Sequence, residues 1–142
     1  RFDMLCLHIS LLMGRIRMLP EDVHKPLNQE FFDRFFRDMD FTLREMGVGD
    51  LGVGKRVRKM SEAFMGRLNA YSEALEQNDK AALALALARN VRRTEGCTDA
   101  DRHMADYVMA CRDRLTVVSD EDLQIGTIDL VAVLALQKVH ND

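Results

Sequence analysis

The chain has 142 residues, of which 47% are hydrophobic and 30% are charged. That length fits one domain with its own core, and the plentiful large apolar residues exclude wholesale disorder. The formal net charge of −3 argues against nucleic-acid binding driven by overall positive charge. No apolar run reaches the roughly 20 residues of a membrane-spanning helix. We therefore expect a single folded domain over residues 1–142.

The spacing of apolar residues predicts helices along most of the chain. Residues 2–18 place apolar side chains three and four positions apart, on more than one side of the helix. This pattern predicts a helix that is buried on much of its circumference and that ends at Pro20. A stripe of phenylalanine, methionine and leucine predicts a second helix over residues 27–46.

The remaining segments continue the helical pattern. Apolar stripes predict helices over residues 55–75 and 79–93. Capping-type sequences that begin at Thr98 and Ser119 predict the starts of two more. The apolar run 130–136 fits either a terminal helix or a buried strand. The fold class is therefore all-α, with five to six helices in one domain.

A glycine-rich segment separates the second and third predicted helices. We expect it to form a loop of defined shape, in which the glycines serve backbone geometry. These glycines are Gly47, Gly49, Gly52 and Gly54. The stretch from Gly49 to Arg56 also matches the phosphate-binding pattern G-x-x-x-x-G-K-[ST] except at its last position. Arg56 replaces the hydroxyl that binds magnesium, so nucleotide binding is kept only as an alternative.

Other sequence signals for catalysis are weak. The four histidines lie far apart, and no cysteine or serine carries a local catalytic signature. His8 lies on an apolar helix, which favours a hydrogen-bonded core histidine over a haem ligand. The three cysteines are odd in number and widely spaced, which favours a reducing compartment. We predict a non-enzymatic protein with no cofactor and no metal.

Two surface features point to a binding role. A cluster of cations opens the third predicted helix, where positive charge opposes the helix dipole. We expect this cluster, Lys55, Arg56, Arg58 and Lys59, to contact an anionic partner: membrane lipid, ribosomal RNA or an acidic client segment. The alternative is a solvated face that pairs with acids of the second helix.

The second feature is the concentration of phenylalanine and methionine on the second and third helices. Methionine side chains are flexible and suit surfaces that accept varied apolar partners. We predict an apolar client-binding groove between these helices, with a floor formed by Phe35, Met39, Leu43, Met60 and Phe64. The alternative is that these five residues form the core.

The segment DMDFTLREMGVGDLGVGKRVRKMSEAFMGRL, residues 38–68, resembles the signature of the ubiquinol–cytochrome c chaperone family. These proteins are assembly factors of respiratory complex III. The resemblance covers roughly residues 3–93. The uninterrupted glycine-rich sequence is similar to that of the alphaproteobacterial branch. After about Ser119 the sequence no longer resembles the usual ending of the family, so the tail over residues 119–142 stays unassigned.

The resemblance implies a chaperone that binds newly made cytochrome b and promotes assembly of complex III. It implies a cytoplasmic position at the periphery of a bacterial inner membrane, or the mitochondrial inner membrane and matrix in a eukaryote. A ribosome or an anionic membrane surface is an expected further partner, and DNA is not. A generic helical scaffold is the remaining alternative.

Overall fold

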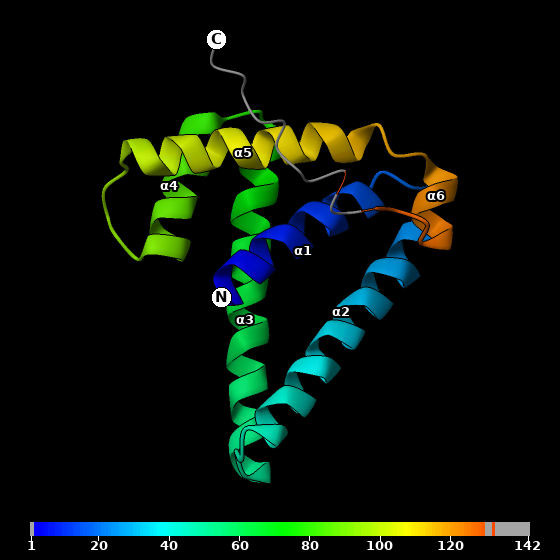
Figure 1. The fold of residues 1–142 in the computed structure, drawn as a ribbon, viewed down its shortest axis with the longest axis vertical. Coiled ribbons are helices and arrows are strands. Elements are labelled where there is room, and N and C mark those ends of the chain that lie inside the picture. Colours follow the sequence, from blue (N-terminus) through cyan, green and yellow to red (C-terminus); the bar gives the residue numbers. More distant parts are fainter. Residues whose placement is uncertain (1, 130–131, 133–142) are drawn as a thin grey trace.

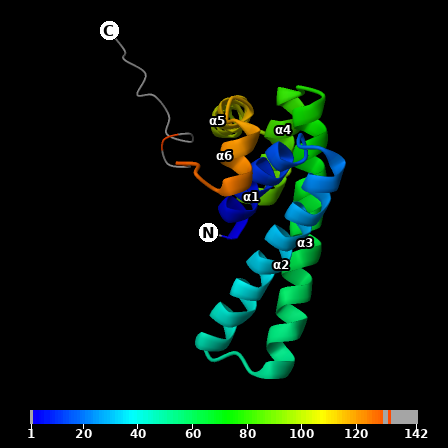
Figure 2. The ribbon, with the colours of Figure 1, turned by 90° about the vertical axis from the view of Figure 1, so that its right-hand side faces the viewer.

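The computed structural model describes residues 2–129 and residue 132. Within them the chain forms six α-helices, one π-helical segment and no strand, which confirms the predicted all-α single domain. The elements are α1 (Phe2–Ile16), α2 (Glu21–Glu45), α3 (Asp50–Glu76), α4 (Lys80–Leu87), η1 (Ala88–Arg92), α5 (Asp99–Thr116) and α6 (Asp120–Ile125). A long hairpin of α2 and α3 extends away from a body that contains α1, α4, α5 and α6 (Figure 1, Figure 2).

Helix α1 is the centre of the packing, because it contributes to all three apolar clusters. Leu7 and Leu11 pack against α3, α4 and α5. Cys6 and Met13 pack on the other side, against the α2–α3 hairpin. Ile16 joins a third cluster, formed with the α1–α2 connection and α6. The prediction of a helix that is buried on much of its circumference is therefore confirmed.

Pro20 marks the start of α2, and Pro26 does not break this helix. The carbonyl of Pro20 accepts hydrogen bonds from the backbone N–H groups of Val23 and His24, both at 2.9 Å, so α2 begins at Glu21. The predicted start at residue 27 is wrong, because Pro26 lies inside the second turn of α2. There it removes a single backbone hydrogen bond near the helix end, where the cost is smaller than in mid-helix.

The helix predicted over residues 79–93 is divided in two. Helix α4 ends at Leu87, and the chain continues as η1, which closes at Arg93 with a φ of 59°. The predicted run 130–136 lies outside the described residues except for Ala132. The start signal at Ser119 is confirmed, since its hydroxyl accepts the N–H of Asp122 at the start of α6.

An ion pair between an exposed arginine and a buried carboxylate joins η1 to α5. Arg92 donates to both carboxylate oxygens of Asp101, at 2.6 and 2.5 Å. The same carboxylate accepts the backbone N–H of Thr98 at 2.7 Å, which completes the capping box predicted at this position. The hydrogen bond from Arg92 lowers the pKa of Asp101 to about 2. The carboxylate thus fixes both the start of α5 and the end of η1.

We expect Asp101→Asn to lower the melting temperature at neutral pH, because an amide cannot accept two bonds from a guanidinium. The lowered pKa sets the sign: stabilisation is complete above the ordinary value of 3.8 and is lost as the pH falls towards about 2. Melting curves of the two proteins should therefore converge near that pH. Asp99→Asn, which alters an exposed pair in the same turn, is the control and should change little. A gap that persists unchanged in acid would contradict this assignment.

Candidate functional site

The predicted client groove between α2 and α3 is mainly a packing seam. Phe64 is fully buried, and its ring lies 5.7 Å from the ring of Phe36 in an edge-to-face contact. Phe35, Met39 and Met60 are half-buried and pack against the same cluster. Phe64 is therefore a core residue rather than an exposed floor. The apolar stripes predict the buried face of each helix correctly, but much of that face holds the hairpin together.

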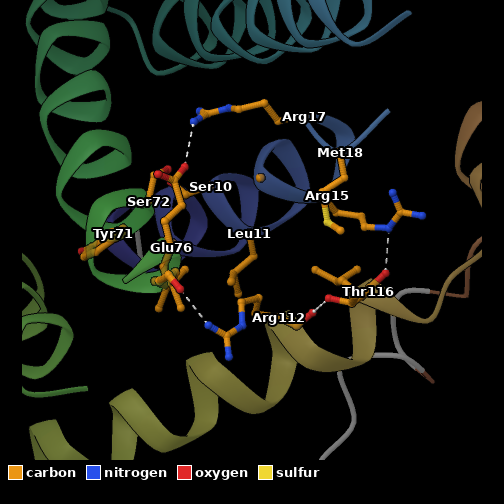
Figure 3. A pocket seen from close by; sticks show the side chains of 14 residues that line it. Ser10, Leu11, Arg15, Arg17, Met18, Tyr71, Ser72, Glu76, Arg112 and Thr116 are labelled. Atoms are coloured by element: carbon orange, nitrogen blue, oxygen red, sulfur yellow. Dashed lines mark hydrogen bonds and ion pairs between the residues drawn. The ribbon is translucent and has the colours of Figure 1, made fainter. Parts of the chain in front are cut away.

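An open apolar pocket lies elsewhere, between α1, the C-terminal part of α3 and α5 (Figure 3). Its volume is about 390 Å³, which is within the range of pockets that hold apolar ligands. Its apolar lining comes from all three helices and consists of Leu7, Leu11, Tyr71, Leu75 and Leu115. Burial raises the pKa of Tyr71 to about 12, so this wall carries a neutral phenol.

Charged and polar side chains surround the mouth of this pocket. Arg17 and Glu76 form an ion pair of 3.7 Å across one side (Figure 3). Arg112 lines another side, and Met18, which also lines the pocket, is 62% exposed. The pocket therefore combines an apolar interior with a rim that carries charges of both signs.

Two arginines hold the walls of the pocket in place. Arg112 on α5 donates to the carbonyl of Leu75 at 2.8 Å, in the last turn of α3. Arg15 on α1 donates to the carbonyl of Leu115 at 3.0 Å, in the last turn of α5. Carbonyls at helix C-termini lack partners within their own helix, so each arginine fixes the end of a neighbouring helix.

Sequence reasoning did not find this pocket. Leu7, Leu11 and Gly14 follow one face of α1 at spacings of four and three, and Met18 continues that face beyond the helix end. This stripe was a usable signal for a second apolar side on α1. The opposing walls, from α3 and α5, lie some sixty and a hundred residues further along the chain, and no local pattern pairs them.

The basic cluster at the start of α3 lies on the surface. Lys55, Arg56 and Lys59 are exposed, and none of them forms an ion pair within the described part of the chain. Arg58 pairs with Glu62 of its own helix, with 3.1 Å between Nε and Oε1. The alternative of pairing with acids of the preceding helix is therefore not what the structure shows.

The connection between α2 and α3 is shorter than predicted, because α3 already begins at Asp50. Gly47 has a φ of +82°, and the backbone N–H groups of Gly47 and Val48 donate to the carbonyls of Arg44 and Leu43, which closes the end of α2. This is a Schellman motif, which favours glycine at its left-handed position. Gly52 lies inside α3, where an added Cβ would approach the Val48 side chain to 3.1 Å.

At Gly49 and Gly54 neither the backbone conformation nor the space for a side chain requires glycine. Gly49 is the N-cap of α3 with a φ of −66°, and an added Cβ at either position meets nothing within 4 Å. The stretch that matches the phosphate-binding pattern is thus mostly helix. The N–H of Val53 bonds the carbonyl of Gly49 at 3.0 Å, so this amide is not free to cradle a phosphate. The geometry argues against the nucleotide-binding alternative.

His8 is the hydrogen-bonded histidine that the sequence predicts. Its Nδ1–H donates to the carbonyl of Met4 at 2.8 Å, and the hydroxyl of Tyr107 donates to Nε2 at 2.8 Å. A carbonyl only accepts, so the ring proton lies on Nδ1 and neither nitrogen is free to bind haem iron. Among the described residues, no three His, Cys, Asp or Glu side chains gather to hold a metal ion.

Comparison with known proteins assigns the chain to a class. A family model described as ubiquinol-cytochrome C chaperone matches residues 1–131. No curated protein matches the chain. The crystal structure of the Cbp3 homolog from Brucella abortus is similar with a TM-score of 0.74 and 43% identity, covering 89% of this chain and 70% of that one.

The chain therefore belongs to the ubiquinol–cytochrome c chaperone family. This confirms the resemblance stated above, and the Brucella relative comes from the alphaproteobacterial branch that the sequence predicts. The match extends beyond residues 3–93 and includes the tail as far as residue 131. Membership supports a chaperone role in complex III assembly and implies a non-enzymatic one. None of the described helices has both the length and the hydropathy needed to cross a bilayer.

The glycine turn gives a direct test of backbone geometry. We expect Gly47→Ala to destabilise the fold by about 1–2 kcal/mol, because a Cβ disfavours the left-handed backbone conformation. Gly54→Ala is the matched control, since its φ is ordinary and its surroundings are open. It should stabilise α3 by about 0.5–1 kcal/mol. Urea unfolding measures both changes, and equal stability of the two variants would contradict the assigned role of Gly47.

Proposed function

We propose that this protein binds newly made cytochrome b during assembly of complex III, and that apolar side chains of the client enter the pocket between α1, α3 and α5. The observation that carries the proposal is the preformed apolar pocket with a charged rim, in a member of this chaperone family. Helical clients are commonly held by apolar anchors in such hydrophobic grooves. The protein acts as a holder of exposed apolar segments and performs no chemistry on them.

The pocket suits this role better than the α2–α3 seam. Phe64 is fully buried, and access to it requires the two helices of the hairpin to separate. That separation would expose a continuous aromatic cluster to water, at roughly 1.5–3 kcal/mol for each large side chain. The pocket needs no such opening, because Leu11 and Leu75 already face a space of about 390 Å³. The half-buried residues Phe35, Met39, Leu43 and Met60 form the competing surface.

The proposed setting is the cytoplasmic periphery of the membrane into which the client is inserted. The basic cluster Lys55, Arg56, Arg58 and Lys59 supports contact with an anionic partner there, either lipid or ribosomal RNA. It lies at the start of α3, whereas the pocket is lined by the C-terminal part of that helix (Figure 1). Client and anionic partner can therefore be bound at the same time.

Site-specific photo-crosslinking tests the client surface. A photoreactive residue at Met18, Ser72 or Thr116, all at the pocket, should capture cytochrome b while it is being synthesised. The photoreactive residue placed instead at Met39 or Met60 tests the seam between α2 and α3. Capture from the pocket positions is the expected result. Capture from the seam alone would move the client site to α2 and α3, and capture of other proteins only would favour a generic helical scaffold.

Gly14 permits a test that separates binding from stability. It lines the pocket, and a Cβ added there meets nothing within 4 Å, so the side chain of Gly14→Leu can start without a clash and should occupy part of the pocket. Helix propensity predicts unchanged or raised thermal stability. Recovery of cytochrome b with the affinity-tagged protein should nevertheless fall severalfold. Gly66→Leu, at an exposed and equally open glycine of α3, is the control and should leave recovery intact.

A further inference from the structure

The turn of the α2–α3 hairpin projects far from the body of the protein (Figure 2). Three large apolar side chains near this turn are exposed, Phe41 at 61%, Met46 at 74% and Leu51 at 96%. We call these three residues the hairpin tip. They come from the last turns of α2, the turn itself and the first turn of α3. Nothing in the described fold covers them, although the seam directly behind them is well packed.

The end of the hairpin is a fixed structure rather than a loose loop. The Schellman motif at Gly47 defines the path of the chain. Arg44 pairs with Asp40 at 2.6 Å and also with Asp50, so it ties α2 to the start of α3. The single positive charge of Arg44 offsets part of the charge of these two carboxylates, and Glu45 beside the turn is a third acid. The hairpin tip is therefore presented in one geometry.

A cluster of positive charge on one side of α3 lies directly behind the hairpin tip. We call Lys55, Arg56, Arg58 and Lys59 the basic collar. One helical turn of about 5.4 Å separates Leu51 from Lys55, and a second turn reaches Lys59. Residues 44–59 carry five cations and two carboxylates, whereas the whole chain has a net charge of −3. Positive charge is thus concentrated at the end of the molecule that also exposes apolar side chains.

We propose that the α2–α3 hairpin docks on an anionic lipid bilayer, with the hairpin tip inserted at the interface and the basic collar on the lipid headgroups. Apolar side chains that enter the headgroup boundary next to cations are the usual means of interfacial binding. A convex end suits the surface of a bilayer, whereas a client helix needs a concave groove. An RNA partner would use the cations but gives no role to Met46 and Leu51. This inference does not depend on the identity of the client.

Vesicle co-sedimentation of the full chain, without client, tests the proposal. We expect binding to vesicles of phosphatidylglycerol and phosphatidylcholine mixed one to two, and much weaker binding to phosphatidylcholine alone. Lys55→Gln, Arg56→Gln and Lys59→Gln together should weaken binding to the anionic vesicles by roughly a hundredfold. Phe41→Ser, Met46→Ser and Leu51→Ser together should weaken it by about tenfold or more. Binding within twofold of wild type for either triple variant would overturn the proposal.

Matched variants separate this surface from general effects of charge or polarity. Met65→Ser, Val117→Ser and Ile125→Ser remove three exposed apolar residues elsewhere and should leave binding unchanged. A second control removes three exposed cations elsewhere, by Lys25→Gln, Arg89→Gln and Arg102→Gln, and should also leave binding unchanged. Loss of binding with these controls, to the same extent as with the test variants, would contradict a specific docking surface. Circular dichroism verifies that each variant is folded.

An environment-sensitive fluorophore distinguishes insertion from surface adsorption. Cys6 and Cys111 are fully buried, so a Leu51→Cys chain with Cys97→Ser offers one accessible thiol for labelling. The emission maximum of the label should shift to shorter wavelength when anionic vesicles are added. A label that stays in water while the protein co-sediments would indicate a polyanion-binding surface, such as one for RNA, and would refute insertion. Because no cytochrome b is present, failure here leaves the proposed client role standing, and the reverse is also true.

Discussion

The burial of Arg15 is the constraint on which the body of this protein depends. Its side chain is 5% exposed, and a buried guanidinium is strongly unfavourable unless its donors find acceptors. Nε donates to the carbonyl of Leu115, and Nη2 donates to the carbonyl of Val118 and to Asp120. The first of these carbonyls lies in the last turn of α5, where the helix dipole favours a cation. One side chain thus joins α1, the end of α5 and the start of α6.

This junction explains why a pocket can stay open inside a small all-α domain. Arg15 holds α1 to α5 at one end, and Arg112 holds α5 to the end of α3 at the other. Between these two points the facing side chains leave a space whose apolar lining includes leucines of all three helices. The α2–α3 hairpin has a different construction, since its aromatic seam is filled and only its end is free. The molecule therefore separates an open apolar pocket from an exposed arm that carries a cluster of cations near the start of α3.

Local signals in the sequence predicted local features well. The capping box from Thr98 to Asp101 depends on residues three apart, and the structure forms it as the sequence indicates. The helical stripes identify the inward faces of α2 and α3 for the same reason. The effect of proline and glycine was harder to predict, because it depends on position. Pro20 begins a helix, and Gly52 and Gly54 lie within one. Counting such residues as breakers placed helix ends several residues from their true positions.

Features made by distant segments were beyond local patterns. The stripe with Phe64 marks an inward face, but only the packed hairpin shows that the face is a filled seam. The pocket depends on Leu11, Leu75 and Leu115 meeting across three helices, and the arginine contacts that hold them span 37 and 100 residues. Long-range pairing of this kind has no periodic signature. The family resemblance predicted the role, and the structure supplied the candidate surface.

Family membership supports a role in complex III assembly, and the proposal adds a direct client, newly made cytochrome b. The most direct test is deletion of the gene in its own host, followed by measurement of cytochrome b and of ubiquinol–cytochrome c reductase activity in isolated membranes. We expect both to fall while the cytochrome b transcript and the activity of an unrelated respiratory complex stay normal, and we expect the wild-type gene to restore them. Normal levels of assembled cytochrome b in the deletion strain would contradict a role of this protein in complex III assembly.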